Sequence, residues 1–177
     1  MKQLGWITAL LWATLWLGGC TGMPQGVSPV SDFDGERYLG QWYEIARLDH
    51  SFERGLEQVT ATYSRREDGG VKVINRGYSP EKAEWKEAEG KAYFVETPDK
   101  GYLKVSFFGP FYGSYVVFGL GADYQHSFIS GPDHSYLWLL ARTPTVSDEV
   151  YQQFVDDAKA RGFDTSQLIR VNQKAAE

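Results

Sequence analysis

The sequence predicts an all-β domain with one C-terminal α-helix, in which eight antiparallel strands close into an up-and-down barrel. Between residues 42 and 142, apolar side chains recur at every second position, which is the spacing of half-buried strands. Clusters of Gly, Pro, Asp and Ser separate these runs, and 15% of the residues are aromatic, as suits strands joined by tight turns. Eight sequential strands can enclose an interior for one small ligand.

The first 19 residues resemble an export signal. Lys2 gives the segment a basic start, an apolar run follows from Leu4 to Leu17, and Gly18 and Gly19 supply small residues at its end. The apolar run is about 14 residues long, whereas a helix that spans a bilayer needs ~20. We therefore expect this signal peptide to be removed rather than to remain as a membrane span.

The only cysteine of the chain, Cys20, follows the signal directly. The run Leu17-Gly18-Gly19-Cys20 resembles the bacterial lipobox, in which the cysteine thiol becomes the attachment point for lipid such as palmitate. Several acyl chains would give a lasting anchor, since each buried methylene contributes about 0.8 kcal/mol. An ordinary secretory signal that ends beside a cysteine is the alternative. Without a second thiol the mature domain forms no internal disulfide, so its core must stabilise it.

Residues 20–32 are rich in Pro, Gly and small polar residues and are predicted to form a flexible tether. The lipobox resemblance, with Thr21 in place of Asp, implies the outer membrane, and we expect the barrel to face the periplasm. The folded domain is expected over residues 33–177.

The overall charge excludes one class of partner. The formal net charge is -5, and loss of Lys2 with the signal leaves 17 Lys and Arg against 23 Asp and Glu, which makes -6. A nucleic-acid partner requires a basic face. No nucleic acid is therefore expected to bind.

The alternating pattern divides into eight strands bounded by turn signals. They are expected near 42–47, 57–66, 70–77, 84–95, 102–108, 114–120, 125–130 and 136–142. After Pro144 the apolar period changes to that of a helix, predicted near 147–161 with Ser147 as N-cap and Gly162 after its end. This amphipathic helix is expected to pack on the outside of the barrel, before a short strand near 168–172.

Three separated segments resemble the signature blocks of the lipocalin family. The first is Gly40-Gln41-Trp42-Tyr43, the third is Arg142, and the middle block keeps only Tyr124 of its usual pattern. The resemblance implies that Arg142 packs across Trp42 and that this pair is structural. The structural signature residues are Gly40, Trp42, Tyr43, Tyr124 and Arg142.

If Arg142 points inward, alternation places Trp138 and Tyr136 on the same inner face. The candidate ligand-binding wall is Ala46, Val59, Ala61, Tyr63, Val73, Val105, Phe107, Tyr115, Val117, Tyr136 and Trp138. Small alanines beside large aromatics would leave an apolar cavity, and three tyrosine phenols would offer hydrogen bonds to a polar head group. The alternative is that these side chains fill the barrel themselves.

The resemblance covers roughly residues 33–172 and is specifically similar to the bacterial branch of the family. It implies a carrier or store of a fatty acid or a lysophospholipid at the envelope, with no catalysis, cofactor or metal. No Gly-x-Ser-x-Gly motif appears, and no His-Glu-x-x-His or paired-Cys spacing suggests a metal. An enzyme on a similar barrel, a haem or metal carrier using His126, and a structural lipoprotein with a filled barrel stay open as alternatives.

Four aromatic residues crowd the segment from Phe107 to Tyr112. If exposed, they form an apolar patch of the kind that meets a membrane or a second subunit, and a homodimer is one expected assembly. Packing under a neighbouring loop is the alternative.

Overall fold

The computed structural model describes residues 21–174. The predicted signal peptide over 1–19 and the predicted lipid anchor at Cys20 lie outside the described residues. Within the described part of the chain, no helix combines the length and apolar character needed to cross a membrane.

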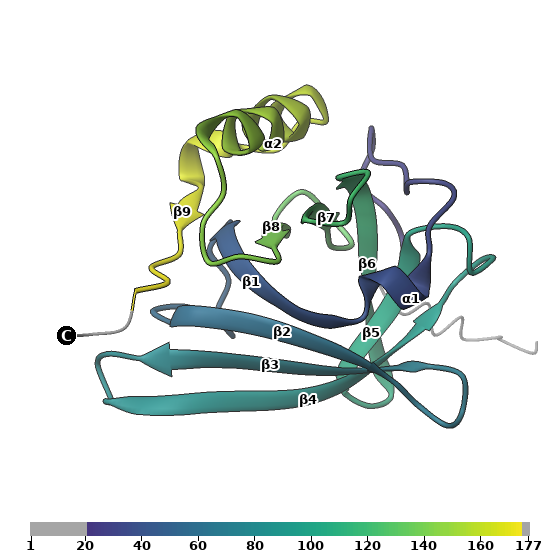
Figure 1. Cartoon of the computed structure of the whole chain (residues 1–177), viewed down its shortest axis with the longest axis horizontal. Coiled ribbons are helices and arrows are strands. Elements are labelled where there is room, and N and C mark those ends of the chain that lie inside the picture. Colours follow the sequence, from purple (N-terminus) through teal and green to yellow (C-terminus); the bar gives the residue numbers. More distant parts are fainter. Residues whose placement is uncertain (1–20, 175–177) are drawn as a thin grey trace, which may run out of the picture.

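The strands form one antiparallel sheet in the order β2-β3-β4-β5-β6-β7-β8-β1-β9, and β1 also pairs with β2. They are β1 (Gly40–Arg47), β2 (Glu57–Arg65), β3 (Val71–Ser79), β4 (Glu84–Phe94), β5 (Tyr102–Phe108), β6 (Phe111–Leu120), β7 (His126–Ser130), β8 (Leu137–Ala141) and β9 (Ile169–Arg170). The second pairing of β1 closes the first eight strands into a barrel (Figure 1). This confirms the predicted fold class, although β6 begins three residues earlier than expected.

Two helices lie at different places on the barrel. The short α1 (Gly35–Tyr38) precedes β1 and is capped by the carboxylate of Asp34, which accepts from two backbone amides. The longer α2 (Asp148–Ala160) begins after the predicted N-cap, Ser147, and packs against the outside of the barrel (Figure 1). A 3-10 turn, η1 (Thr165–Gln167), leads from α2 to β9.

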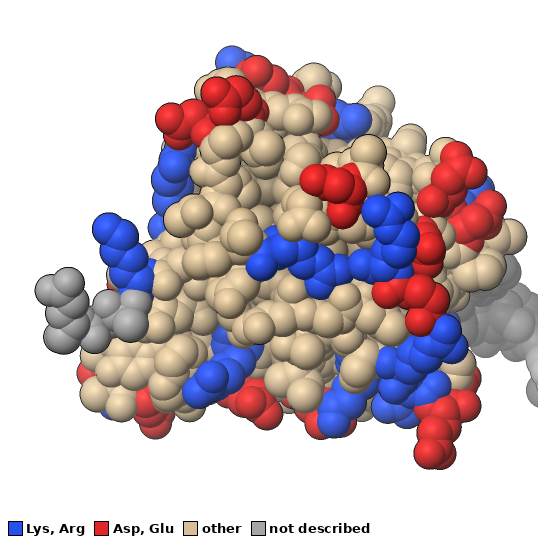
Figure 2. All heavy atoms as spheres, in the orientation of Figure 1, with Lys and Arg blue, Asp and Glu red and all other residues tan. Residues whose placement is uncertain are grey.

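The barrel wall separates two apolar cores. The outer core lies between the wall and α2, where Phe154 and Ala158 are fully buried. The interior core lies inside the barrel around Trp42 and Ile129. The exposed face of α2 is acidic, whereas side chains of both signs are interspersed elsewhere on the face shown in Figure 2.

The position predicted for Ala46 on the inner wall is wrong. A register shift between Glu44 and Ala46 in the pairing of β1 with β8 interrupts the simple alternation. Ala46 therefore joins the outer core beneath α2, while Glu44 and Arg47 turn inward, opposite Leu140 and Trp138. One extra residue in a strand is enough to reverse which face its neighbours occupy.

The described part of the predicted flexible tether, residues 20–32, is instead attached to the outer wall of the barrel. Val27 is buried in the outer core. The backbone of Val30 donates to the carbonyl of Val117 at 2.9 Å and accepts from the amide of Gly101 at 3.0 Å. Composition predicted a free chain, but these tertiary contacts offset the cost of ordering it.

Candidate functional site

The candidate site is the barrel interior, which is closed at one end by a floor of stacked side chains. The guanidinium of Arg142 lies 3.9 Å from the ring centre of Trp42, which is fully buried. Arg142 also donates to the carbonyl oxygens of Arg37 and Gln41, and the indole of Trp42 donates to the carbonyl of Tyr38 at 2.8 Å. These contacts hold α1 across the end of the barrel. The pair is structural and lies beneath the space a ligand would use.

Three tyrosines form a hydrogen-bonded layer above the floor. The hydroxyl of Tyr115 lies 2.8 Å from the hydroxyls of both Tyr38 and Tyr63, and that of Tyr38 lies 3.0 Å from Ser127 Oγ. Burial raises the pKa of Tyr38 to about 12 and that of its two partners well above the ordinary value, so all three phenols stay neutral. The sequence predicted the hydroxyls of Tyr63 and Tyr115 as partners for a ligand, but in the structure they are hydrogen-bonded to each other, and that of Tyr115 also to Tyr38.

Small residues line the inner wall towards the open end. Gly90 lies opposite Val73, and Ala88 lies opposite Asn75, so each pair points to the same inner face. A side chain on Gly90 would come within 2.8 Å of the ring of Phe107, so glycine is required for this close approach. Ala88 is exposed to solvent although it faces inward. The inner face of the wall is therefore accessible to solvent at Ala88.

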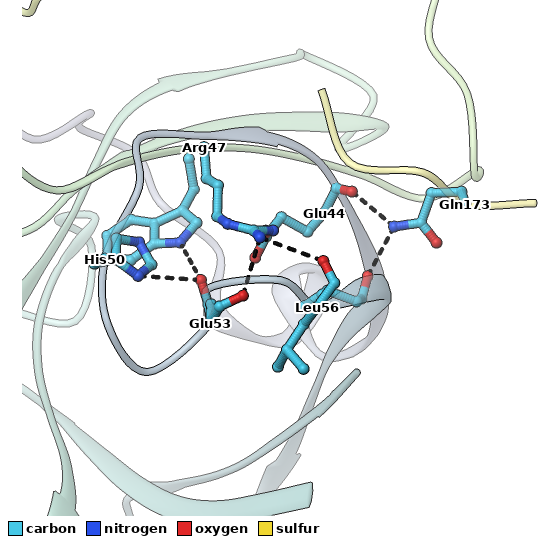
Figure 3. Close-up of polar contacts among 8 residues, drawn as sticks. Glu44, Arg47, His50, Glu53, Leu56 and Gln173 are labelled. Atoms are coloured by element: carbon cyan, nitrogen blue, oxygen red, sulfur yellow. Dashed lines mark hydrogen bonds and ion pairs between the residues drawn. The ribbon is translucent and has the colours of Figure 1, made fainter. Parts of the chain in front are cut away.

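The opposite wall carries a buried polar cluster at the mouth (Figure 3). Arg47 donates to Glu44 Oε1 at 2.7 Å, and both side chains are less than 5% exposed. Its second terminal nitrogen donates to the carbonyl oxygens of Glu53 and Leu56, and Trp138 donates to Glu53 Oε2 at 3.1 Å. The loop from 48 to 56 is thereby tied across the mouth.

This cluster has more carboxyl groups than cations. Burial raises the pKa of Glu44 well above its ordinary value, and the neighbouring Glu53 raises it further, while Arg47 acts in the opposite direction. Burial likewise raises the pKa of Glu53. Two buried carboxyl groups that face one arginine are not both easily ionised, so the mouth favours a shared proton.

His50 contributes a neutral ring to the same cluster. Burial, followed by the charge of Arg47, lowers its pKa to about 4. Its Nδ1 lies 3.5 Å from Glu53 Oε2, which is an ion pair only when the ring is protonated. Neither ring nitrogen has a hydrogen-bond partner among the residues described. The ring stacks on Phe52 at 4.3 Å and on Tyr136 at 5.6 Å.

This arrangement makes the acid stability of the fold depend on His50. Since the folded pKa of about 4 lies below the ordinary 6.5, the contribution of His50 is present above pH 6.5 and is lost as pH falls through 4. His50→Phe retains an aromatic ring for stacking and removes the proton-binding site. In urea titrations from pH 7 to pH 4 the variant should lose less stability than the natural protein. Parallel losses would contradict this assignment.

Most predicted wall residues do face the interior. Those in or against the interior core are Ala61, Tyr63, Val73, Val105, Phe107, Tyr115, Val117 and Trp138. Val59 is buried beside Gly77, Tyr136 lies at the mouth, and Ala46 lies outside. Contact of these residues with a ligand stays a prediction.

The residues predicted from the sequence to line the interior do not include the charged cluster at the mouth or Tyr38. Alternation from Trp42 could have placed Glu44 inside, but the inward turn of Arg47 depends on the bulge. Glu53 and His50 come from a loop, whose path carries no periodic signal.

The alternative that the protein carries haem or a metal required the side chain of His126 to point into the barrel. His126 instead lies opposite Ala141 of the outer core and stacks on Phe128 at 5.5 Å, also in that core. Over residues 21–174, no group of three or more His, Cys, Asp or Glu side chains is placed to hold a metal ion.

A shallow hollow of about 730 Å³ also lies beside α1, outside the barrel. Asp34, Arg37 and Tyr124 are among its lining residues. Because its surface is largely polar, it suits an apolar ligand less well than the barrel interior does.

Comparisons with a family model and with the sequences of known proteins agree on the family of this chain. Residues 33–173 match the family model of a lipocalin-like domain. The chain is 63% identical over 166 residues to a Vibrio cholerae protein named outer membrane lipoprotein Blc, covering 93% of this chain and 97% of that protein. The Escherichia coli K12 protein of the same name is 59% identical over 150 residues, 85% of each chain.

More distant matches share the fold. Temperature-induced lipocalin-1 of Arabidopsis thaliana is 37% identical over 154 residues, 81% of each chain. The solved structure of insecticyanin from the tobacco hornworm Manduca sexta superposes with a TM-score of 0.67 at 20% identity, covering 88% of each chain. This likeness shows that the two chains share a fold.

Proposed function

Because the chain belongs to the lipocalin family, we propose that its barrel binds a single-chain lipid, a fatty acid or a lysophospholipid, at the bacterial cell envelope. The observation that carries this proposal is the asymmetry of the interior. Its lower half is closed by aromatic rings. Its upper half has small and apolar residues on one wall, where Ala88 is exposed to solvent, and the charged cluster on the opposite wall.

An acyl chain suits the apolar part of this interior. Leu103, Val105 and Ile129 belong to or pack against the interior core, and they present aliphatic surface towards the axis of the barrel. Each Å² of apolar surface removed from water contributes about 25 cal/mol. The tyrosine layer forms the lower limit of this space. The acyl chain therefore enters from the mouth, with its methyl end towards the tyrosine layer.

The polar head of such a ligand would lie near the cluster at the mouth. Arg47 already uses its terminal nitrogens on Glu44 and on two backbone carbonyls. Because these nitrogens are already bonded, the head group contacts the rim of the mouth and solvent as much as any one charged side chain.

The proposed setting is the outer membrane. The two bacterial relatives are named as outer membrane lipoproteins, and Cys20 occupies the position of a lipid-bearing cysteine in the sequence. The role proposed is therefore that of a lipid-anchored carrier or store. The family and the names of these relatives favour binding over catalysis.

Two substitutions at adjacent positions of β4 test where the ligand lies. In the unlipidated mature domain, made with Cys20→Ser, Ala88→Phe should weaken binding of a fluorescent fatty acid about tenfold, or ~1.4 kcal/mol. The added ring would occupy the open part of the inner wall. Glu89→Phe, which points outward from the neighbouring position opposite Ile74, should leave the affinity unchanged.

Displacement by an unlabelled fatty acid and by a lysophospholipid would then rank the two ligand classes. If the folded domain gives no saturable signal with either lipid, the carrier function is wrong. Equal affinities of the two Phe variants would place the ligand outside the barrel.

A further inference from the structure

Two phenylalanine rings project from the connection between β5 and β6. The side chains of Phe108 and Phe111 belong to residues that are 81% and 75% exposed, more than any other large apolar residue described. The up-and-down topology places this connection at the mouth, the same end as the loop from 48 to 56. Exposed aromatic pairs at a turn are unusual on a surface that faces only water.

The hairpin that carries these rings also lacks acidic residues. From Gly101 to Ala122 there is no Asp or Glu, and Lys104 is the only charged residue, although the chain has 23 acidic residues in all. The other connections at the mouth contain carboxylates, among them Glu53, Glu81 and Asp133. The β5–β6 hairpin therefore meets an apolar or anionic surface with the least electrostatic cost.

The first described residues of the chain are attached to the same two strands. The hydroxyl of Tyr102, in β5, donates to the carbonyl of Thr21, and Ser114 Oγ, in β6, donates to the carbonyl of Gly22 at 2.6 Å. Cys20 precedes Thr21 directly in the sequence. A lipid on Cys20 would therefore be linked to this side of the barrel through one residue rather than through a long tether.

We propose that the tip Phe108-Gly109-Pro110-Phe111 inserts into the leaflet that holds the lipid of Cys20. This inference rests on the lipid anchor in the proposed function. Anchor and tip belong to one side of the barrel, so together they form two points of attachment and set the orientation of the mouth relative to the bilayer. Aromatic rings are suited to the interfacial region, and Lys104, which lies 5.1 Å from the ring centre of Tyr112, supplies a cation beside it.

A fluorescent label at the tip tests the insertion in the lipidated protein. Because Cys20 is the only cysteine and its thiol is consumed by the lipid, Gly109→Cys introduces one reactive thiol. A Cβ atom at Gly109 would have no heavy atom within 4 Å apart from its own residue and its two chain neighbours, so the position is open to a cysteine. The matched control is Gln152→Cys, an exposed position on α2.

Both labelled proteins are reconstituted in vesicles of phosphatidylethanolamine and phosphatidylglycerol that contain a brominated phospholipid. We expect the emission of the label at position 109 to shift to the blue and to be roughly halved by the bromine, with little change at position 152. Adding Phe108→Ser and Phe111→Ser should remove both effects while the protein still sediments with the vesicles.

Other results would overturn the proposal. If the label at position 109 is as exposed to water as the label at position 152, the tip does not insert. Disulfide crosslinking between copies through Gly109→Cys, without quenching by brominated lipid, identifies the tip as a contact between subunits. Failure of the unmodified protein to sediment with vesicles contradicts the anchor itself. Binding of fatty acid in the barrel, measured separately, should be unchanged by the two Ser substitutions.

Discussion

Replacing Arg47 with Leu should lower the free energy of unfolding by about 3–5 kcal/mol, because it leaves buried acceptors without their donor. Arg47 is 2% exposed and binds Glu44 together with the backbone carbonyls of Glu53 and Leu56. Its loss would force Glu44 to take up a proton or to draw water into the mouth. Equilibrium urea unfolding followed by circular dichroism measures the effect.

The control is an arginine of the loop that Arg47 holds, and its partner is exposed. Arg54 pairs with Asp49 at 2.7 Å, and their side chains are 64% and 41% exposed. Arg54→Leu should therefore cost less than about 1 kcal/mol. Similar small losses in both variants would show that the cluster at the mouth does not hold the loop.

Trp42→Ala should be comparably destabilising, by about 3–5 kcal/mol, because it removes the central ring of the floor. The indole is fully buried, donates to the carbonyl of Tyr38 and lies under the guanidinium of Arg142. Its removal leaves a cavity and deprives Arg142 of its stacking surface. Differential scanning calorimetry would record a large fall in the melting temperature.

Trp85→Ala provides the matched comparison. Trp85 also stacks with a guanidinium, that of Arg76 at 3.9 Å, but it is 45% exposed on the outside of β4. Its loss should cost much less, since little buried volume is removed. If the two tryptophan variants melted together, the floor would not be the stabilising element described.

The strands and α2 could be predicted from the sequence because their signals are local. Alternation from Val59 to Tyr63 reflects a wall with one buried face, and Ser147 followed by an amphipathic run is a local helix start. Other features of the fold depend on tertiary contacts and could not be predicted in this way. The bulge after Glu44 moved Ala46 outside, and the packing of Val27 fixed a segment that composition predicted to be free.

The candidate site was predicted only where it belongs to regular strands. Tyr63 and Tyr115 were correctly placed inside, but the hydrogen bonds of their hydroxyls, to each other and from Tyr115 to Tyr38 in α1, are non-local contacts. His50 and Glu53 come from an irregular loop that folds into the mouth. Such a path is set by long-range hydrogen bonds rather than by a repeat in the sequence.

Short-range fluorescence quenching can show whether an acyl chain lies inside the barrel. Residues 20–177 contain three tryptophans at distinct places: Trp42 in the floor, Trp138 against the interior core near the mouth, and Trp85 on the outside of β4. A fatty acid brominated along its chain quenches only the rings it contacts.

Three forms of the unlipidated domain are titrated with this lipid. All three carry Cys20→Ser. One has no other substitution, one also carries Trp138→Phe, and one also carries Trp85→Phe. We expect saturable quenching near one lipid per protein, which is retained with Trp85→Phe and largely lost with Trp138→Phe. Absence of saturable quenching in the folded domain, or quenching that Trp138→Phe leaves unchanged, would contradict this expectation.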